Sequence, residues 1–426
     1  MKKLRIAAVL VAAGVVAASG AFAQELKFDG YVNAGLGVVY SSEKDAPDPF
    51  VAAAAVDSWN NAYRIRLHAS YTNEPGSAGA FLRFQASGGI NDIGFQAAYG
   101  WLSVFDKGLT IKGGIVDDGT WNTAGAFLGS DAGEGLGALA KISPIDGLDI
   151  GVGAYLAETP GEGGNSSFAD HSTKTDLPDS SDSTKSRFAG NYYAQGLDEA
   201  KYTASLGYTL PEKVKIVASY RHKSEAGVSA DTPQLSGRLR TGLSLLAVPN
   251  LKAVLELELD NLQDFKALKK DEKTAWDTTV TSAAGSSGKI NIYETFQYDL
   301  GSLSVGLSAV QWLSQAEGAD LSLYANPWVS YALESIVPRL DLGYGNGAQA
   351  GFNNSNLNWH RANYSAAYDS DVSVISIRPS VKINIDSKTF VEIGGLIDID
   401  GNKTTKWGED DSRISNVFYV DFKWAF

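Results

Sequence analysis

The chain repeats one pattern along most of its length, in which apolar and polar side chains alternate at every second position. In the segment 251–260, four leucines and an alanine occupy every other position, and charged side chains fill most of the places between them. A period of two puts successive side chains on opposite faces of a β-strand. A helical spacing would instead scatter both sets around a cylinder. The sequence therefore predicts an all-β fold.

We expect 18 such strands along the chain. They are expected at residues 26–40, 63–71, 79–88, 92–105, 108–116, 134–143, 148–157, 200–210, 213–221, 234–246, 251–260, 288–300, 302–313, 320–331, 338–345, 372–386, 388–398 and 411–426. Short turns, such as Asp106–Gly108 and Ser335–Pro338, mostly alternate with long polar connections, such as 117–133. This alternation is typical of barrels with turns at one end and loops at the other. The pattern predicts a single transmembrane antiparallel up-and-down β-barrel of about 18 strands, with 16 as the alternative.

The N-terminal residues are typical of a secretory signal. Lys2, Lys3 and Arg5 precede an apolar run at 6–18, and Ala21-Phe22-Ala23 provides a small-residue cleavage site. The apolar run is too short for a transmembrane helix, which needs about 20 residues. We therefore expect residues 1–23 to be a cleaved signal peptide and residues 24–426 to form the barrel.

The last strand, expected at 411–426, has one face that is apolar almost throughout, and that face finishes on the aromatic residues Phe422, Trp424 and Phe426. It resembles the terminal strand of outer-membrane β-barrel proteins, in which such aromatics form the signal that the insertion machinery reads. The resemblance implies a location in the outer membrane, contact with its lipid, and the barrel-assembly machinery as a partner.

The amino-acid composition argues against several classes of function, including nucleic-acid binding, metal binding and hydrolysis. The formal net charge of −13 argues against nucleic acid as a partner. The chain has no cysteine, so it offers neither disulfides nor thiolate metal ligands. Its four histidines are dispersed without metal-ligand spacing, and no nucleophile motif of a hydrolase is present. We expect no cofactor, no metal site and no enzymatic activity.

A charge asymmetry across the expected lumen is the strongest candidate site. Arg64, Arg66 and Arg83 share the polar face of two neighbouring strands. The third external loop contributes four acidic residues, Asp117, Asp118, Asp131 and Glu134. The arrangement resembles the diffusion porins, whose third loop sets acidic groups opposite a basic wall, although the recognisable loop sequence of that family is absent. Alternatively, these arginines are ordinary solubilising residues and the loop stays outside.

Other polar residues are expected to line the pore. They are His68, Lys215, Arg221, Arg238, Arg240, Arg378 and Lys382. We expect Arg238 and Arg240 to pair with Glu256 and Glu258, because opposite charges on a shared face of neighbouring strands stabilise a sheet. Aromatic residues expected on the outer surface, at the level of the lipid headgroups, are Trp101, Tyr208, Tyr220, Tyr331, Phe418 and Trp424.

The resemblance to porins implies a water-filled channel for passive diffusion of small hydrophilic solutes or ions. Porins of this kind are often homotrimers, but we find no trimer motif. The alternative is a surface adhesin or receptor, in which the barrel serves to display the long polar loops 158–199 and 261–287.

Overall fold

The computed structural model of the chain consists of strands and the turns between them. It describes residues 25–41, 49–53, 63–73, 76–87, 93–116, 135–155, 201–222, 237–260, 262, 288–314, 321–346, 373–400 and 413–426. The signal peptide expected at 1–23 and the acidic loop at 117–134 lie outside these residues. No helix in the described ranges is long and apolar enough to cross a membrane.

The strands follow the chain in simple order. The first ten are β1 (Glu25–Ser41), β2 (Phe50–Ala53), β3 (Tyr63–Thr72), β4 (Ala78–Ser87), β5 (Ile93–Val104), β6 (Leu109–Val116), β7 (Gly135–Ile145), β8 (Leu148–Tyr155), β9 (Lys201–Leu210) and β10 (Val214–Arg221). The remaining nine are β11 (Arg238–Leu245), β12 (Leu251–Asp260), β13 (Lys289–Leu300), β14 (Leu303–Ser314), β15 (Ser322–Tyr331), β16 (Ile336–Asn346), β17 (Ser373–Asn384), β18 (Phe390–Asp400) and β19 (Arg413–Ala425).

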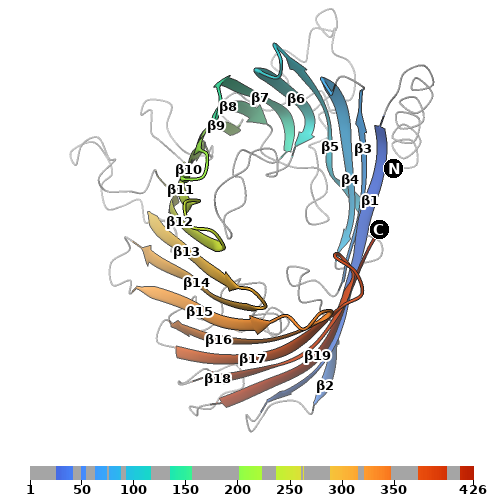
Figure 1. The fold of residues 1–426 in the computed structure, drawn as a ribbon, viewed down its shortest axis with the longest axis vertical. Helices are drawn as coiled ribbons and strands as arrows, with labels where there is room; N and C mark the ends of the chain where they lie inside the picture. The colour runs from blue at the N-terminus through green and yellow to red at the C-terminus, as the bar shows by residue number, and fades with distance from the viewer. Residues whose placement is uncertain are drawn as a thin grey trace, which may run out of the picture.

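The sheet closes on itself, as the ring of strands in Figure 1 shows. From β3 to β19, each strand pairs antiparallel with the next one in the chain. β1 completes the circle, because it pairs with β19 along residues 31–41 and with β3 along residues 25–34. Closure leaves no exposed sheet edge along these strands. The predicted fold class, an antiparallel β-barrel, is confirmed.

The short strand β2 was not predicted, since it lies between the strands expected at 26–40 and 63–71. It pairs with Leu36–Val39 of β1. The same edge of β1 pairs with β3 at residues 25–34. β2 therefore continues the line of β3 and adds no new position around the circumference. The 19 strands thus form a barrel of 18 positions, which agrees with the predicted number.

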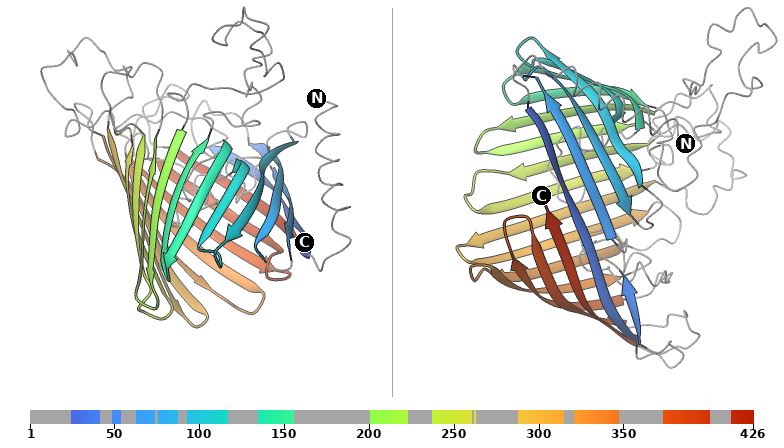
Figure 2. Two further views of the ribbon diagram at one scale, coloured as in Figure 1. Left: turned by 90° about the horizontal axis from the view of Figure 1, so that it is seen from above. Right: turned by 90° about the vertical axis from the view of Figure 1, so that its right-hand side faces the viewer.

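The short hairpin turns gather at one end of the barrel (Figure 2). β1 begins at this end, since Glu25 lies opposite Thr72, just before the turn between β3 and β4. β19 also finishes here, with Ala425 opposite Tyr31. One turn was predicted wrongly: Pro338 lies inside β16, opposite Val381, and not in the preceding turn. Its side chain shares the outward face of Ile336 and Leu340.

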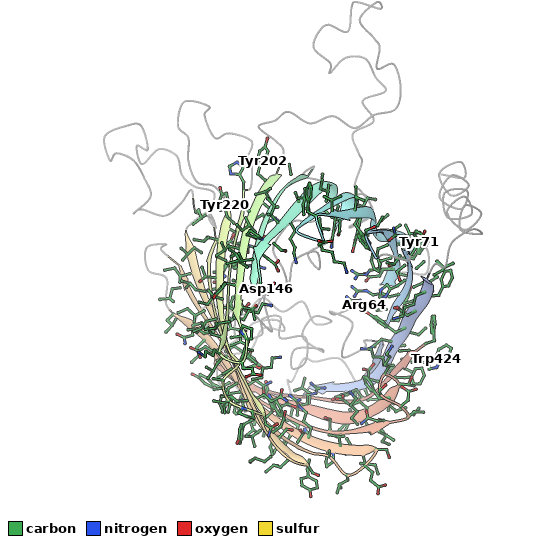
Figure 3. All side chains as sticks on the ribbon, turned by 45° about the horizontal axis from the view of Figure 1, so that its top comes forward. Arg64, Tyr71, Asp146, Tyr202, Tyr220 and Trp424 are labelled. Carbon is green, nitrogen blue, oxygen red and sulfur yellow. The ribbon has the colours of Figure 1, made fainter. Side chains whose placement is uncertain are left out.

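Side chains alternate between the two faces of the barrel wall. Those on the outer face are mainly large and apolar, and many remain exposed, such as Phe28 at 61% and Phe418 at 70%. In Figure 3, Tyr71, Tyr202, Tyr220 and Trp424 point away from the ring, whereas Arg64 points into it. Most of the polar and charged residues are on the inner face, so a site for a hydrophilic ligand belongs there.

Candidate functional site

The inner face of β1 and β3–β6 carries most of its charge as cations, and we call it the basic arc. Its described charged side chains are Lys27, Asp29, Arg64, Arg66, Arg83 and Lys112. These six side chains, five cations and one carboxylate, together carry a formal charge of +4, with His68 counted as neutral. The acidic loop residues expected across from this arc, Asp117, Asp118, Asp131 and Glu134, lie outside the described residues.

A hydrogen-bonded chain crosses three strands of the basic arc. The imidazole Nδ1 of His68 lies 2.7 Å from a carboxylate oxygen of Asp29. Arg83 donates from Nε to the other ring nitrogen of His68, at 3.3 Å. Because an arginine can only donate, this contact requires His68 to accept at Nε2 and to donate from Nδ1 to Asp29. The histidine thus links a carboxylate to a guanidinium without adding a charge of its own.

The predicted constriction arginines lie together on this arc. Arg66 donates from Nε to the side-chain oxygen of Gln85, at 2.5 Å, and its guanidinium lies 5.9 Å from the ring centre of Tyr31. Arg64 is the most enclosed of the three, with 6% of its surface exposed. The pairing of β3 with β4 therefore places Arg64, Arg66 and Arg83 on one patch of the inner wall, without any contribution from the loops.

The second predicted basic group forms ion pairs across strands β11 and β12. Arg240 donates to Glu258 at 2.6 Å, and Arg238 lies 3.3 Å from Asp260 and 3.7 Å from Glu258. Asn291 of β13 donates a further hydrogen bond of 2.6 Å to Glu258. The predicted cross-strand pairing is confirmed for Glu258. These cations are neutralised by their neighbours.

Lys215 and Arg221 of β10 also belong to the inner face, because Ile216 between them is 43% exposed on the outside. Lys215 lies opposite Ser244, and Arg221 lies opposite Arg238. These two residues extend the polar inner face between β9 and β11, and their role in lining a pore stays a prediction.

The inner face of β16–β19 carries a dense network, and we call it the paired arc. Arg378, only 5% exposed, donates to Glu392 at 2.5 Å and to the hydroxyl of Tyr419 at 2.8 Å. The hydroxyl of Tyr419 donates in turn to Glu392, at 2.8 Å. The three side chains come from three successive strands and close a triangle of hydrogen bonds. Such a network fixes each side chain and neutralises the guanidinium.

A second ion pair and a cation–aromatic contact complete the paired arc. Arg339 donates two hydrogen bonds to Asp341, at 2.6 and 2.8 Å, and its guanidinium lies 4.2 Å from the ring centre of Trp328. Asp341 is completely buried. The ammonium of Lys382 lies 3.8 Å from the ring centre of Phe390. The sequence singled out Arg378 and Lys382 but missed Arg339, Asp341 and Glu392, which the same alternation rule places on this face.

Aromatic rings of the inner wall lie over glycines of the neighbouring strand. Trp101 is directly opposite Gly79, Trp328 opposite Gly306, and Tyr419 opposite Gly394. A Cβ atom on Gly79 would come within 2.6 Å of the indole Nε1 of Trp101. Because glycine has no Cβ atom, the ring of the neighbouring aromatic residue can pack over its backbone. Such glycine–aromatic pairs are a known way of accommodating large aromatic side chains on a β-sheet.

Trp101 was predicted on the outer surface, and this prediction is wrong. The pairing of β4 with β5 shifts register between Arg83 and Phe84, which leaves Gln96 as an extra residue in β5. One extra residue inverts the alternation of the strand beyond it. Leu102 is consequently 50% exposed on the outside, and Trp101 faces inward opposite Gly79 and Lys112.

The aromatic residues of the last strand lie on the outer face, as predicted. Phe422, Trp424 and Phe426 are 39%, 49% and 51% exposed. The backbone of Phe426 exchanges two hydrogen bonds of 3.1 Å with Gly30 of β1. The strand that carries the proposed insertion signal is therefore also the strand that closes the barrel.

Among the described residues, no group of three or more histidine or carboxylate side chains could hold a metal ion.

The comparisons with known proteins found matches among solved structures. No family model matches the chain, and no curated protein matches it. Among solved structures, it is similar to the outer membrane protein OpdK of Pseudomonas aeruginosa, with 10% identity and a TM-score of 0.48 over 94% of this chain and 99% of that one. It is also similar to OccK11 (OpdR) of the same organism, with 11% identity and a TM-score of 0.49 over 94% and 96%.

A triple mutant of the porin of Rhodopseudomonas blastica is also similar, with 14% identity and a TM-score of 0.43 over 94% of this chain and 100% of that one. At such identities and scores, the function of this chain has to be inferred from its own residues.

Proposed function

We propose that this protein is a porin, which forms a water-filled channel for passive diffusion of small hydrophilic solutes or ions across the outer membrane. The observation that carries the proposal is a closed barrel of 18 positions with an apolar outer face and a charged inner face. Barrels of 16–18 strands are too wide for side chains to fill, and they leave an aqueous channel. Charged groups along such a channel favour polar solutes over apolar ones.

The outer face supports a membrane location for the barrel. Large apolar side chains are exposed around the whole circumference, for example Leu36 on β1, Ile150 on β8 and Val329 on β15. A protein dissolved in water rarely exposes a continuous apolar surface of more than a few hundred Å². We also propose that residues 1–23 are cleaved after export, and that the barrel-assembly machinery reads Phe422, Trp424 and Phe426.

The basic arc is the proposed selectivity element of the channel. Its formal charge of +4 arises from strand residues, so it faces the lumen whatever the adjacent loops do. We propose that Arg64, Arg66 and Arg83 form one side of the constriction and that the acidic residues of loop 117–134 form the other side. Opposed charges would create a transverse field that orients water and polar solutes.

Recording from planar lipid bilayers tests the proposal directly. Purified protein that shows the heat-modifiable gel mobility of a folded barrel should insert and produce stepwise increases in conductance. A parallel sample of unfolded protein controls for detergent artefacts. Folded barrel that enters the bilayer without any conductance step would exclude the channel function.

A further inference from the structure

A cavity lies at the end of the barrel where the short turns gather, beside the seam at which β1 pairs with β19. Its volume is about 380 Å³, which is within the size range of small-molecule sites. The first residues of β1, the last residues of β19, and the turn between β17 and β18 contribute its walls. We call this cavity the seam pocket.

The side chains that line the seam pocket include three lysines and one carboxylate. Lys382 belongs to β17, Lys423 belongs to β19, and Lys388 lies in the turn that joins β17 to β18. The carboxylate is Asp29, which already accepts a hydrogen bond from His68. An excess of positive charge remains even when the terminal carboxylate of Phe426, which also lines the pocket, is counted.

Two aromatic rings hold the ammonium groups in place. The Nζ atoms of Lys382 and Lys423 lie 3.8 and 5.8 Å from the ring centre of Phe390. Lys423 also lies 5.1 Å from the ring centre of Tyr31. A cation near the face of an aromatic ring is attracted to it. The pairing of β18 with β19 sets Phe390 directly opposite Lys423, so the register of the sheet brings both lysines to one ring.

The carboxylates nearest in the sheet have other partners. Glu392 lies opposite Lys382, but it accepts hydrogen bonds from Arg378 and Tyr419. In the part of the chain that the structure describes, Lys382 forms no ion pair. Asp386, in the same turn as Lys388, accepts from two backbone N–H groups. An anion from solution can therefore supply a counter-charge to the pocket and gain Coulomb energy by doing so.

The residue types indicate the class of anion. Arginine presents a planar fork that matches a carboxylate with two parallel hydrogen bonds, whereas lysine is a compact point charge with three donors and serves as a phosphate binder. Three ammonium groups around one pocket can each meet a different oxygen of a tetrahedral phosphate. The hydroxyl of Ser387, in the same pocket, adds a neutral donor.

We propose that the seam pocket is a binding site for inorganic phosphate or for the phosphate group of a small dissolved molecule, held by Lys382, Lys388 and Lys423. The site is distinct from the proposed constriction, because Arg64, Arg66 and Arg83 do not line it. The inference depends on the closed barrel and is independent of the channel function.

Equilibrium dialysis with radiolabelled inorganic phosphate tests the proposal. The whole folded barrel is used in a non-ionic detergent without phospholipid, so that the bound label is free phosphate and not a lipid headgroup. We expect saturable binding that weakens as the ionic strength rises from about 0.1 M to about 1 M, because of screening. Acetate, the carboxylate competitor, should displace the label roughly tenfold less effectively than unlabelled phosphate.

Lys382→Gln/Lys423→Gln should weaken phosphate binding by about tenfold or more, because two of the three ammonium groups are lost. The matched control is Lys141→Gln/Lys252→Gln, which removes two lysines from the inner faces of β7 and β12 near the same end of the barrel. It should bind phosphate like the wild type. Lys388→Gln changes only an exposed turn side chain and should weaken binding by a smaller factor, which keeps the test valid if the double variant misfolds.

Three outcomes would overturn the inference. They are binding that the control pair weakens as much as Lys382→Gln/Lys423→Gln, binding that no substitution in the pocket weakens, and displacement by acetate as effective as that by phosphate. Bilayer conductance of the same samples separates the two proposals. A barrel that conducts without lysine-dependent phosphate binding refutes the seam pocket alone, and one that binds phosphate but does not conduct refutes the channel alone.

Discussion

The basic arc and the paired arc face the same lumen, yet their arginines have different partners. On the basic arc, Arg66 donates to a neutral amide and Arg83 to a neutral imidazole. On the paired arc, Arg339 and Arg378 donate directly to carboxylates of the same or a neighbouring strand. The same residue type thus serves two purposes, depending on which side chains surround it on the inner face.

The two arcs also differ in the net formal charge of their inner faces. On β16–β19, the inward charged side chains whose own placement is described are Arg339, Arg378, Lys382 and Lys423 against Asp341, Glu392 and Asp421, and these four cations less three anions give +1. The basic arc has +4 over a similar number of strands. A wall with internal neutralisation stabilises the barrel, whereas a wall with excess charge acts on the solution in the lumen. We therefore propose that the paired arc stabilises the barrel and that the basic arc determines the selectivity of the channel.

The largest effect should come from breaking the triangle of the paired arc. Glu392→Leu leaves Arg378, which is 5% exposed, without its carboxylate. Removal of one partner of a buried ion pair typically costs about 3 kcal/mol or more. We expect a comparable loss in the free energy of unfolding, measured by urea titration with tryptophan fluorescence in lipid vesicles.

The matched control is Arg378→Leu/Glu392→Leu, which removes both charges and leaves none uncompensated. It should recover most of the lost stability, because apolar replacements of a whole buried pair are often neutral. If the double variant is as unstable as Glu392→Leu, the barrel is stabilised by the ion pair itself. The loss of stability in Glu392→Leu would then not come from leaving the charge of Arg378 without its carboxylate.

The second effect concerns the ion selectivity of the channel. Replacement of Arg64, Arg66 and Arg83 by glutamine removes three positive charges from the basic arc and should shift the zero-current potential toward cation selectivity. A change of about 1.4 kcal/mol, which is a modest Coulomb energy for charges a few ångströms from an ion in water, alters the permeability ratio roughly tenfold. The potential is measured across a salt gradient at about 0.1 M, and the shift should diminish near 1 M because of screening.

The charge-neutral double variant Arg378→Leu/Glu392→Leu controls for general damage to the pore. It should leave the zero-current potential unchanged. If it shifts the potential as much as the triple arginine variant, the division of labour between the two arcs is wrong.

The strand pattern could be predicted from the sequence because it is local. A period of two is visible within each segment, and it correctly placed Arg64 inside and Trp424 outside. The failures arose where one residue breaks the period or where a strand is too short to show it. The extra residue Gln96 inverted the face of Trp101, and four residues were too few to reveal β2.

The contacts of the candidate site were harder to predict, because they depend on register between strands. The pair Arg240–Glu258 was foreseen, since both residues belong to consecutive strands joined by a short turn. The triangle of Arg378, Glu392 and Tyr419 spans three strands, and its geometry requires two registers to be correct at once. A shift of one residue in either would place one member on the outer face.

The smallest effect should come from the turn that joins β17 to β18 beneath the paired arc. The backbone N–H groups of Lys388 and Thr389 donate to Asp386 at 2.7 and 2.8 Å, and these bonds hold the pKa of Asp386 below its ordinary value. A lowered pKa in the folded state means that the charged carboxylate favours folding. This contribution is complete above about pH 4, the pKa of an unfolded aspartate, and is lost as the pH falls through the folded value.

Asp386→Asn is the informative substitution, since the asparagine oxygen can accept the same two hydrogen bonds without titrating in this range. Urea unfolding between pH 2 and 7 should show a shallower acid loss of stability for Asp386→Asn than for the wild type, with similar turns at low pH. The effect is small because the carboxylate is fully exposed. Identical pH profiles for the two proteins would mean that the turn makes no pH-dependent contribution, and that acid sensitivity of the paired arc arises within its buried network.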